Sequence, residues 1–159
     1  MAEASIGKII KNDYAAFLLV VGGPIALGIA GLTLALGFIP RARGAGGQEV
    51  HPQVVIAMGI VAIVITALLL ALLARRVSWI KRVVRTGPKA QAVITAVAFF
   101  KDRGRVEFEY AHAGQTLRSG TAIMKNRQTE SYASGVKIEV AIDLKNPLKA
   151  LIIELYRNA

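Results

Sequence analysis

The sequence VVIAMGIVAIVITALLLALLA occupies residues 54–74, and RRVSWIKRVVR follows it directly at residues 75–85. The first stretch has 21 residues without a charged side chain, and the second has five basic residues and no acidic one. At a rise of about 1.5 Å per residue, such a helix matches the roughly 30 Å hydrocarbon core of a bilayer. A basic segment beside it is typical of the cytoplasmic membrane face. The pattern predicts a spanning helix that leaves the bilayer on the cytoplasmic side.

A second uncharged run covers residues 15–39. It is too long for the apolar region of a signal peptide, so we predict a retained transmembrane helix that is tilted in the bilayer. Small residues recur along it at four-residue spacing, which lets another helix approach closely. The predicted helix-packing residues are Gly22, Ala26, Ala30, Gly31 and Ala35. Their partner is either the helix at 54–74 or a helix of a different protein.

Charge counting sets the expected topology. Residues 40–53 form a glycine-rich loop with two arginines, whereas eight basic residues flank the opposite helix ends. The positive-inside rule places this loop outside and both termini in the cytoplasm, which fits a multi-pass protein of a bacterial inner membrane. Residues 1–14 are predicted to be an amphipathic interfacial segment, or alternatively the first turns of the next helix.

The basic segment at residues 75–88 is predicted to be a juxtamembrane helix that ends at Gly87-Pro88. It carries half of the net charge of +10, and this distribution favours lipid phosphates over nucleic acid. The predicted contacts with anionic phospholipids are Arg75, Arg76, Trp79, Lys81, Arg82 and Arg85. The alternative is a topology determinant that binds no specific lipid.

From residue 89 onward, apolar residues alternate with polar ones, which is the pattern of β-strands. One strand is expected to place Val93, Thr95, Val97 and Phe99 on one face, followed by a turn in which Gly104 supplies a left-handed position. The expected strands are residues 91–100, 105–110, 115–120, 136–143 and 148–156. The predicted fold is a membrane α-helical hairpin of two transmembrane helices, followed at 89–159 by a small all-β domain of about five strands, either OB-like or a curled antiparallel sheet.

Three motifs in this region resemble those of a bacterial membrane family. They are the glycine and small-residue strand beginning at Gly87, the strand and turn at residues 106–116, and the glycine, alternating strand and turn at residues 135–147. Over residues 87–155 the pattern resembles domain-of-unknown-function family 3592, in which membrane helices join a small β domain. Ile142 and Leu144 depart from it, because the family usually has an aromatic residue and a proline at these positions. A weaker similarity is to membrane proteins with an OB-like domain linked to stomatin-like partners. The resemblance implies a fold and a membrane setting, and no site.

No stretch carries recognisable catalytic chemistry. The only histidines, His51 and His112, are expected on opposite sides of the membrane, and Glu107 and Glu109 form a solvated strand face. The absence of cysteine excludes thiolate sites and disulfides. We therefore expect a non-catalytic, membrane-anchored module without a cofactor or metal. The expected partners are other membrane subunits or a second copy, together with anionic phospholipids.

Three alternative functions fit parts of the sequence. A lipid-binding protein fits the basic segment, and a self-associating scaffold fits the small-residue faces. A tethered nucleic-acid-binding domain would need an exposed aromatic platform in a basic groove, for which the sequence offers Phe99, Phe100, Phe108 and Tyr110. Acidic residues interleave the basic ones here, so neither nucleic acid nor a small-molecule substrate is expected.

Overall fold

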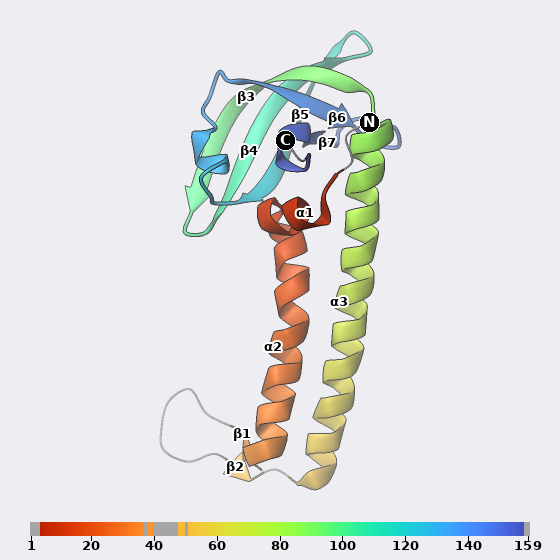
Figure 1. Ribbon diagram of the computed structural model, residues 1–159, viewed down its shortest axis with the longest axis vertical. Coiled ribbons are helices and arrows are strands. Elements are labelled where there is room, and N and C mark those ends of the chain that lie inside the picture. The colour runs from red at the N-terminus through yellow and green to blue at the C-terminus, as the bar shows by residue number, and fades with distance from the viewer. Residues whose placement is uncertain (1–3, 37, 40–47, 50, 158–159) are drawn as a thin grey trace. The chain divides into compact units, whose positions relative to one another are not determined.

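The computed structural model describes residues 4–36, 38–39, 48–49 and 51–157. The chain divides into two compact units, a helical unit at residues 18–74 and a β unit formed by residues 1–17 with 75–159. The helical unit contains two long apolar helices, and the β unit contains a five-stranded antiparallel sheet (Figure 1). This architecture confirms the predicted helical hairpin followed by a small β domain.

The two apolar helices are α2, Tyr14–Leu36, and α3, Pro52–Thr86. Their most apolar windows have mean hydropathies of 2.2 and 3.0, and both helices are long enough to cross a bilayer. α2 ends three residues before the predicted limit, because Phe38–Ile39 form a short strand, β1, that pairs with β2 at Gln48–Glu49. Residues 40–47 and 50 of the predicted loop lie outside the described residues.

α3 continues without interruption through the basic segment and ends at Thr86, as the sequence predicts. Gly87 closes the helix by donating its amide to Val83 O at 2.8 Å. A Cβ at position 87 would lie 2.5 Å from the carbonyl oxygens of Val83 and Ile142. Only glycine therefore lets the helix end approach the sheet this closely.

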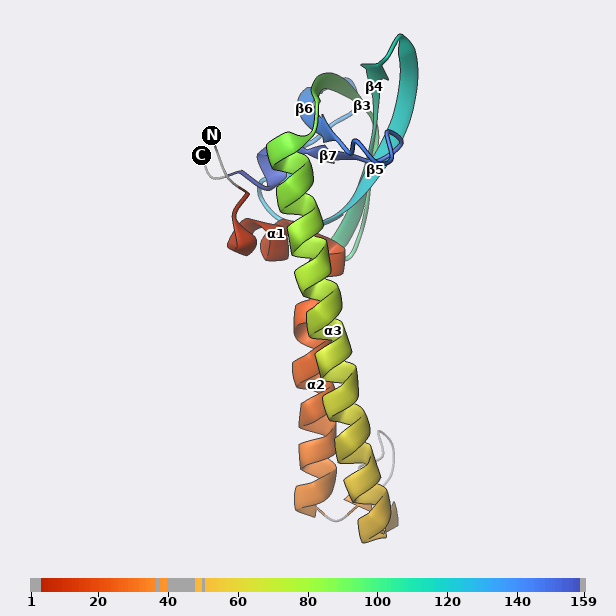
Figure 2. The ribbon, with the colours of Figure 1, turned by 90° about the vertical axis from the view of Figure 1, so that its right-hand side faces the viewer.

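The sheet has the strand order β5-β4-β3-β6-β7, and every neighbouring pair is antiparallel. Its edges approach each other where Ala150 N of β7 donates to Ser119 Oγ of β5 at 3.3 Å, so the sheet nearly closes into a barrel (Figure 2). The strands are β3 Lys89–Phe100, β4 Arg103–His112, β5 Gln115–Met124, β6 Lys137–Ile142 and β7 Ala150–Ile152. Two 3-10 helices complete the unit, η1 Thr129–Ser131 and η2 Ile153–Leu155.

The predicted face of β3 is wrong at its beginning. Ala92 and Ile94 point into the core, each 1% exposed, while Val93 is 42% exposed. A register shift between Ile94 and Ala96 marks a β-bulge, beyond which the odd-numbered residues are the less exposed ones. An extra residue in one strand reverses which side chains face the core, and the alternation of the sequence does not reveal it. On β4 the predicted core face is confirmed, because Val106, Phe108 and Tyr110 are buried.

The turn between β3 and β4 is also tighter than predicted. Phe100 pairs with Arg103, so Lys101 and Asp102 alone form the turn, and Lys101 takes the left-handed conformation with φ 53°. Gly104 instead lies within β4 opposite Phe99, where a Cβ would meet the Phe99 ring at 2.5 Å. β5 runs four residues beyond its predicted end, and β7 is shorter than predicted because η2 follows it.

The N-terminal segment forms its own short helix, α1, Ile6–Asn12, and Asp13 is extended before α2 begins. α1 packs against β5 and η2, with Ile9 completely buried and Ile6 51% exposed. Ile9 is therefore part of the core of the β unit, and the interfacial position of residues 1–14 stays a prediction.

Candidate functional site: the junction of the helix ends with the barrel

A buried carboxylate joins three parts of the β unit. Asp13, with no exposed surface, accepts Nε and Nη2 of Arg76 in α3 at 2.9 and 2.8 Å, one on each oxygen. Its Oδ1 also accepts the Ala16 amide at 2.8 Å, which makes Asp13 the N-cap of α2. Tyr156, beyond η2, donates its hydroxyl to Oδ2 at 3.3 Å. One side chain thus ties the first turn of α2 to α3 and to the C-terminal segment.

The charge of Asp13 stabilises the protonated forms of Arg76 and Tyr156. Burial alone would lower the pKa of Arg76, but the hydrogen bonds and charge of Asp13 outweigh it and raise the pKa above its ordinary value. Burial, reinforced by the Asp13 charge, raises the pKa of Tyr156 above its ordinary value of 10.0. The guanidinium is therefore cationic and the phenol neutral at physiological pH. A bidentate pair of this kind fixes geometry more strictly than a single contact.

A second polar contact lies farther along α3. The Trp79 indole donates to Asp143 Oδ2 at 2.8 Å, and Asp143 is 6% exposed at the end of β6. Burial alone would raise the pKa of Asp143, but the Trp79 bond, the Lys145 amide and the charges of Arg82 and Lys145 hold it below 3.8. Arg76 lies 5.8 Å from the Trp79 ring centroid, within cation–π range, so the two contacts adjoin.

Asparagines extend the junction to the loop after β5. Asn12, 1% exposed, donates to Leu155 O at 2.6 Å and accepts from Asn126 Nδ2 at 2.9 Å. Sequence reasoning did not single out Asn12, Asp13, Tyr156 or Asp143. Only Asp13 had a usable indication, as a lone acid directly before an uncharged run, which is the pattern of an N-cap.

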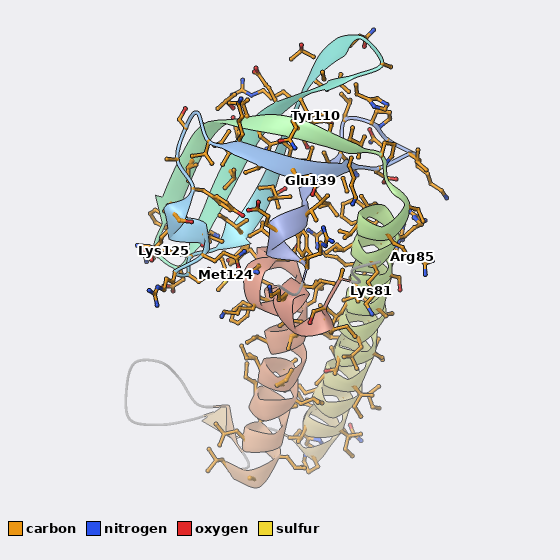
Figure 3. All side chains as sticks on the ribbon, turned by 45° about the horizontal axis from the view of Figure 1, so that its top comes forward. Lys81, Arg85, Tyr110, Met124, Lys125 and Glu139 are labelled. Atoms are coloured by element: carbon orange, nitrogen blue, oxygen red, sulfur yellow. The ribbon has the colours of Figure 1, made fainter. Side chains whose placement is uncertain are left out.

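The predicted lipid contacts separate into two groups. Arg76 and Trp79 already have partners in the junction, whereas Arg75, Arg82 and Arg85 are exposed and Lys81 is half-buried. Lys81 and Arg85 lie along the last turns of α3 (Figure 3). Lipid binding by Arg75, Lys81, Arg82 and Arg85 stays a prediction.

The predicted helix-packing residues also fall into two groups, those that face α3 and those that are exposed. In the helical unit, a Cβ at Gly22 would meet Leu69 of α3 at 3.0 Å, and Ala26 and Ala30 line a groove with α3. Gly31 and Ala35 are exposed, and a Cβ at Gly31 would meet nothing within 4 Å. The first three residues thus face the second helix of the same chain. Gly23, against Thr66 at 3.0 Å, belongs to the same contact and was not predicted.

The groove between α2 and α3 has a volume of about 330 Å³ and an apolar lining. It is lined by Ala26, Ile29, Ala30, Val54, Ala57, Met58, Val61, Ala62 and Ile65. Of the two hydroxyl groups of this unit, Thr33 donates to Ile29 O within α2. Thr66 donates to Ala62 O within α3 and also lies 3.4 Å from Gly23 O of α2. An apolar surface of this kind can pack against lipid tails or another helix.

The candidate catalytic groups His51, His112, Glu107 and Glu109 are exposed or half-buried. Across residues 4–36, 38–39, 48–49 and 51–157, no three histidine, aspartate or glutamate side chains gather as a metal site would require. His51 is exposed, and His112 ends β4 at the β4–β5 turn. Glu107 is paired with Arg105 and Arg118 at 3.1 and 2.8 Å on the open face of the sheet. These contacts are those of a solvated strand surface.

Comparison of this chain with protein-family models, curated proteins and solved structures finds no match.

Proposed function

We propose that this chain is a non-catalytic, membrane-anchored interaction module that serves as an accessory subunit of a larger membrane protein complex. The supporting observation is the small share of each helix that the chain itself covers. Only 11% of the most apolar window of α2, and 11% of that of α3, is buried. The remaining apolar surface is available to lipid or to helices of other subunits.

The β unit supports the same proposal. Within this unit, Asp13 at the start of α2 binds Arg76 of α3 and accepts the Tyr156 hydroxyl of the C-terminal segment. Such contacts give the β unit a fixed internal geometry, which suits a domain that docks on a partner. In this proposal the helices span a bacterial inner membrane. Both termini and the barrel lie on its cytoplasmic side, as charge counting predicts. Membership of domain-of-unknown-function family 3592 is part of the proposal and rests on the sequence motifs.

A self-associating scaffold is the alternative within the same class. The outward position of Gly31 and Ala35 would serve a second copy as well as a foreign helix. A nucleic-acid-binding barrel is less favoured, because Phe108 and Tyr110 are 0% and 2% exposed and cannot stack on bases. Phe99 is half-buried, so Phe100, 62% exposed, is the one exposed ring of the four expected to form the platform.

The test is the mass and subunit composition of the complex extracted from its native membranes in a mild detergent. A defined set of other subunits is expected. A homo-oligomer would establish the self-associating scaffold instead. A bare monomer would contradict both the accessory-subunit and the scaffold proposals.

A matched pair of variants locates the contact on α2. Gly31→Leu adds a side chain where nothing lies within 4 Å, so it should leave the hairpin intact and release the partner subunits. Gly22→Leu collides with Leu69 at 3.0 Å and should loosen the hairpin itself. Retention of every subunit by Gly31→Leu would place the partner contact elsewhere.

A further inference from the structure

The β3–β4 turn carries an exposed aromatic side chain between basic ones. Phe100 is 62% exposed, and Lys101 and Arg103 are exposed beside it. Lys101 Nζ and Arg103 Cζ each lie 5.6 Å from the Phe100 ring centroid. A largely exposed aromatic ring next to cations matches the chemistry of the membrane interface, where rings insert among headgroups and cations meet phosphates.

The same turn touches the first residue of α2. Arg103 Nη1 donates to the Tyr14 hydroxyl at 3.3 Å, and its Cζ lies 5.6 Å from the Tyr14 ring centroid. Tyr14 directly precedes the uncharged run that begins at Ala15. Where α2 crosses a bilayer, its first residue lies at headgroup level, the depth at which tyrosine is enriched. Because Arg103 contacts Tyr14, the turn lies at that depth too.

Further contacts hold the turn in this place. Asp13 bridges to Ile123 near the end of β5, and Arg103 pairs with Met124. The Lys125 amide donates to Asp102 O in the turn at 2.9 Å. Figure 3 shows Met124 and Lys125 at this edge of the sheet. The start of α2, the end of β5 and the β3–β4 turn therefore form one connected edge.

We propose that the β3–β4 turn is a membrane contact of the barrel. Phe100 inserts into the interfacial region of the leaflet at which α2 begins, and Lys101 and Arg103 bind the phosphates of anionic phospholipids there. The inference rests on α2 crossing a bilayer and does not depend on the accessory-subunit proposal.

The first experiment measures the depth of the turn. The chain has no cysteine, so Phe100→Cys gives a single labelling site for an environment-sensitive nitrobenzoxadiazole dye. The full chain is placed alone in nanodiscs of phosphatidylcholine and phosphatidylglycerol with spin-labelled lipid as quencher. The control, Gln115→Cys, carries the dye on the exposed start of β5 at the β4–β5 turn. A blue-shifted emission and several-fold stronger quenching are expected at position 100, and equal quenching at both positions would overturn the proposal.

The second experiment tests the headgroup. Quenching at position 100 should fall in nanodiscs of phosphatidylcholine alone, and should fall similarly in mixed nanodiscs when Lys101→Gln and Arg103→Gln are introduced. Lys137→Gln with Lys149→Gln, at exposed basic residues of another part of the barrel, should leave it unchanged. The emission of Trp79 shows whether the junction is intact in each variant. Quenching that is independent of both lipid charge and these basic residues would overturn the assignment of anionic phospholipid as the ligand.

Discussion

Replacement of Asp13 by alanine should destabilise the β unit strongly. The carboxylate is completely buried and accepts four hydrogen bonds, two from Arg76 and one each from Ala16 N and the Tyr156 hydroxyl. Alanine would leave the guanidinium and the phenol without their partner and α2 without its cap.

The magnitude follows from these contacts. Removing one partner of a buried ion pair costs about 3–5 kcal/mol. Because the Arg76 side chain is 32% exposed, water can solvate part of it, and the lower end of that range, about 3 kcal/mol, applies. Loss of the cap adds about 1 kcal/mol, so Asp13→Ala should cost about 4 kcal/mol. Asp13→Asn keeps a capping oxygen and should cost about 1 kcal/mol less.

Trp79 provides the assay. It is the only tryptophan of the chain and lies in the junction, hydrogen-bonded to Asp143. Its fluorescence during urea unfolding in detergent reports the free energy of unfolding of each variant, and the midpoint gives the difference between variants. In a unit of this size, the expected loss lowers the melting temperature by about 12 °C or more. Glu109→Ala, at an exposed position of β4, is the matched control and should change little.

A double-mutant cycle measures the interaction energy between Asp13 and Arg76 apart from their other contacts. Asp13→Ala and Arg76→Ala should be non-additive, because the second substitution removes the charge that the first left without a partner. An Asp13→Ala variant within about 0.5 kcal/mol of the unsubstituted protein, or strict additivity of the two substitutions, would refute the reasoning.

The remaining predictions use the same unfolding measurement. Because the folded pKa of Asp143 lies below 3.8, its contribution to the free energy of unfolding is present above that pH and is lost as the pH falls further. Asp143→Asn should abolish this loss of stability at low pH. Burial, and then the charge of Glu154, raises the pKa of Tyr132 from 10.0 to about 12, so stability should fall as the pH rises from 10.0 to about 12. The Tyr132 hydroxyl is buried without a hydrogen-bond partner, so Tyr132→Phe should remove this alkaline loss and, at neutral pH, leave stability unchanged or raise it by up to about 1 kcal/mol. Gly104→Ala should cost about 1–3 kcal/mol because its Cβ would meet a ring carbon at 2.5 Å, whereas Gly120→Ala meets only the flexible Arg105 side chain and should cost less.

The candidate site could be predicted only in part. Runs of uncharged residues and clusters of basic ones are local properties, so the sequence indicated the spanning helices and the basic end of α3. It did not indicate that Arg76 and Trp79 turn toward the barrel, because their partners, Asp13 and Asp143, lie 63 and 64 residues away. The basic segment looked like one surface and is divided between exposed residues and the junction.

Helix spans, the number of strands and the core face of β4 were determined by the sequence itself. The reason is that hydrocarbon thickness and strand alternation act on neighbouring residues. Tertiary structure alone decided the bulge that exposes Val93 and the tight turn that makes Lys101 left-handed. It also decided the burial of Asp13 and the contact of Arg103 with Tyr14. These features depend on which strands and helix ends meet, and that choice is made by the packing of the whole unit.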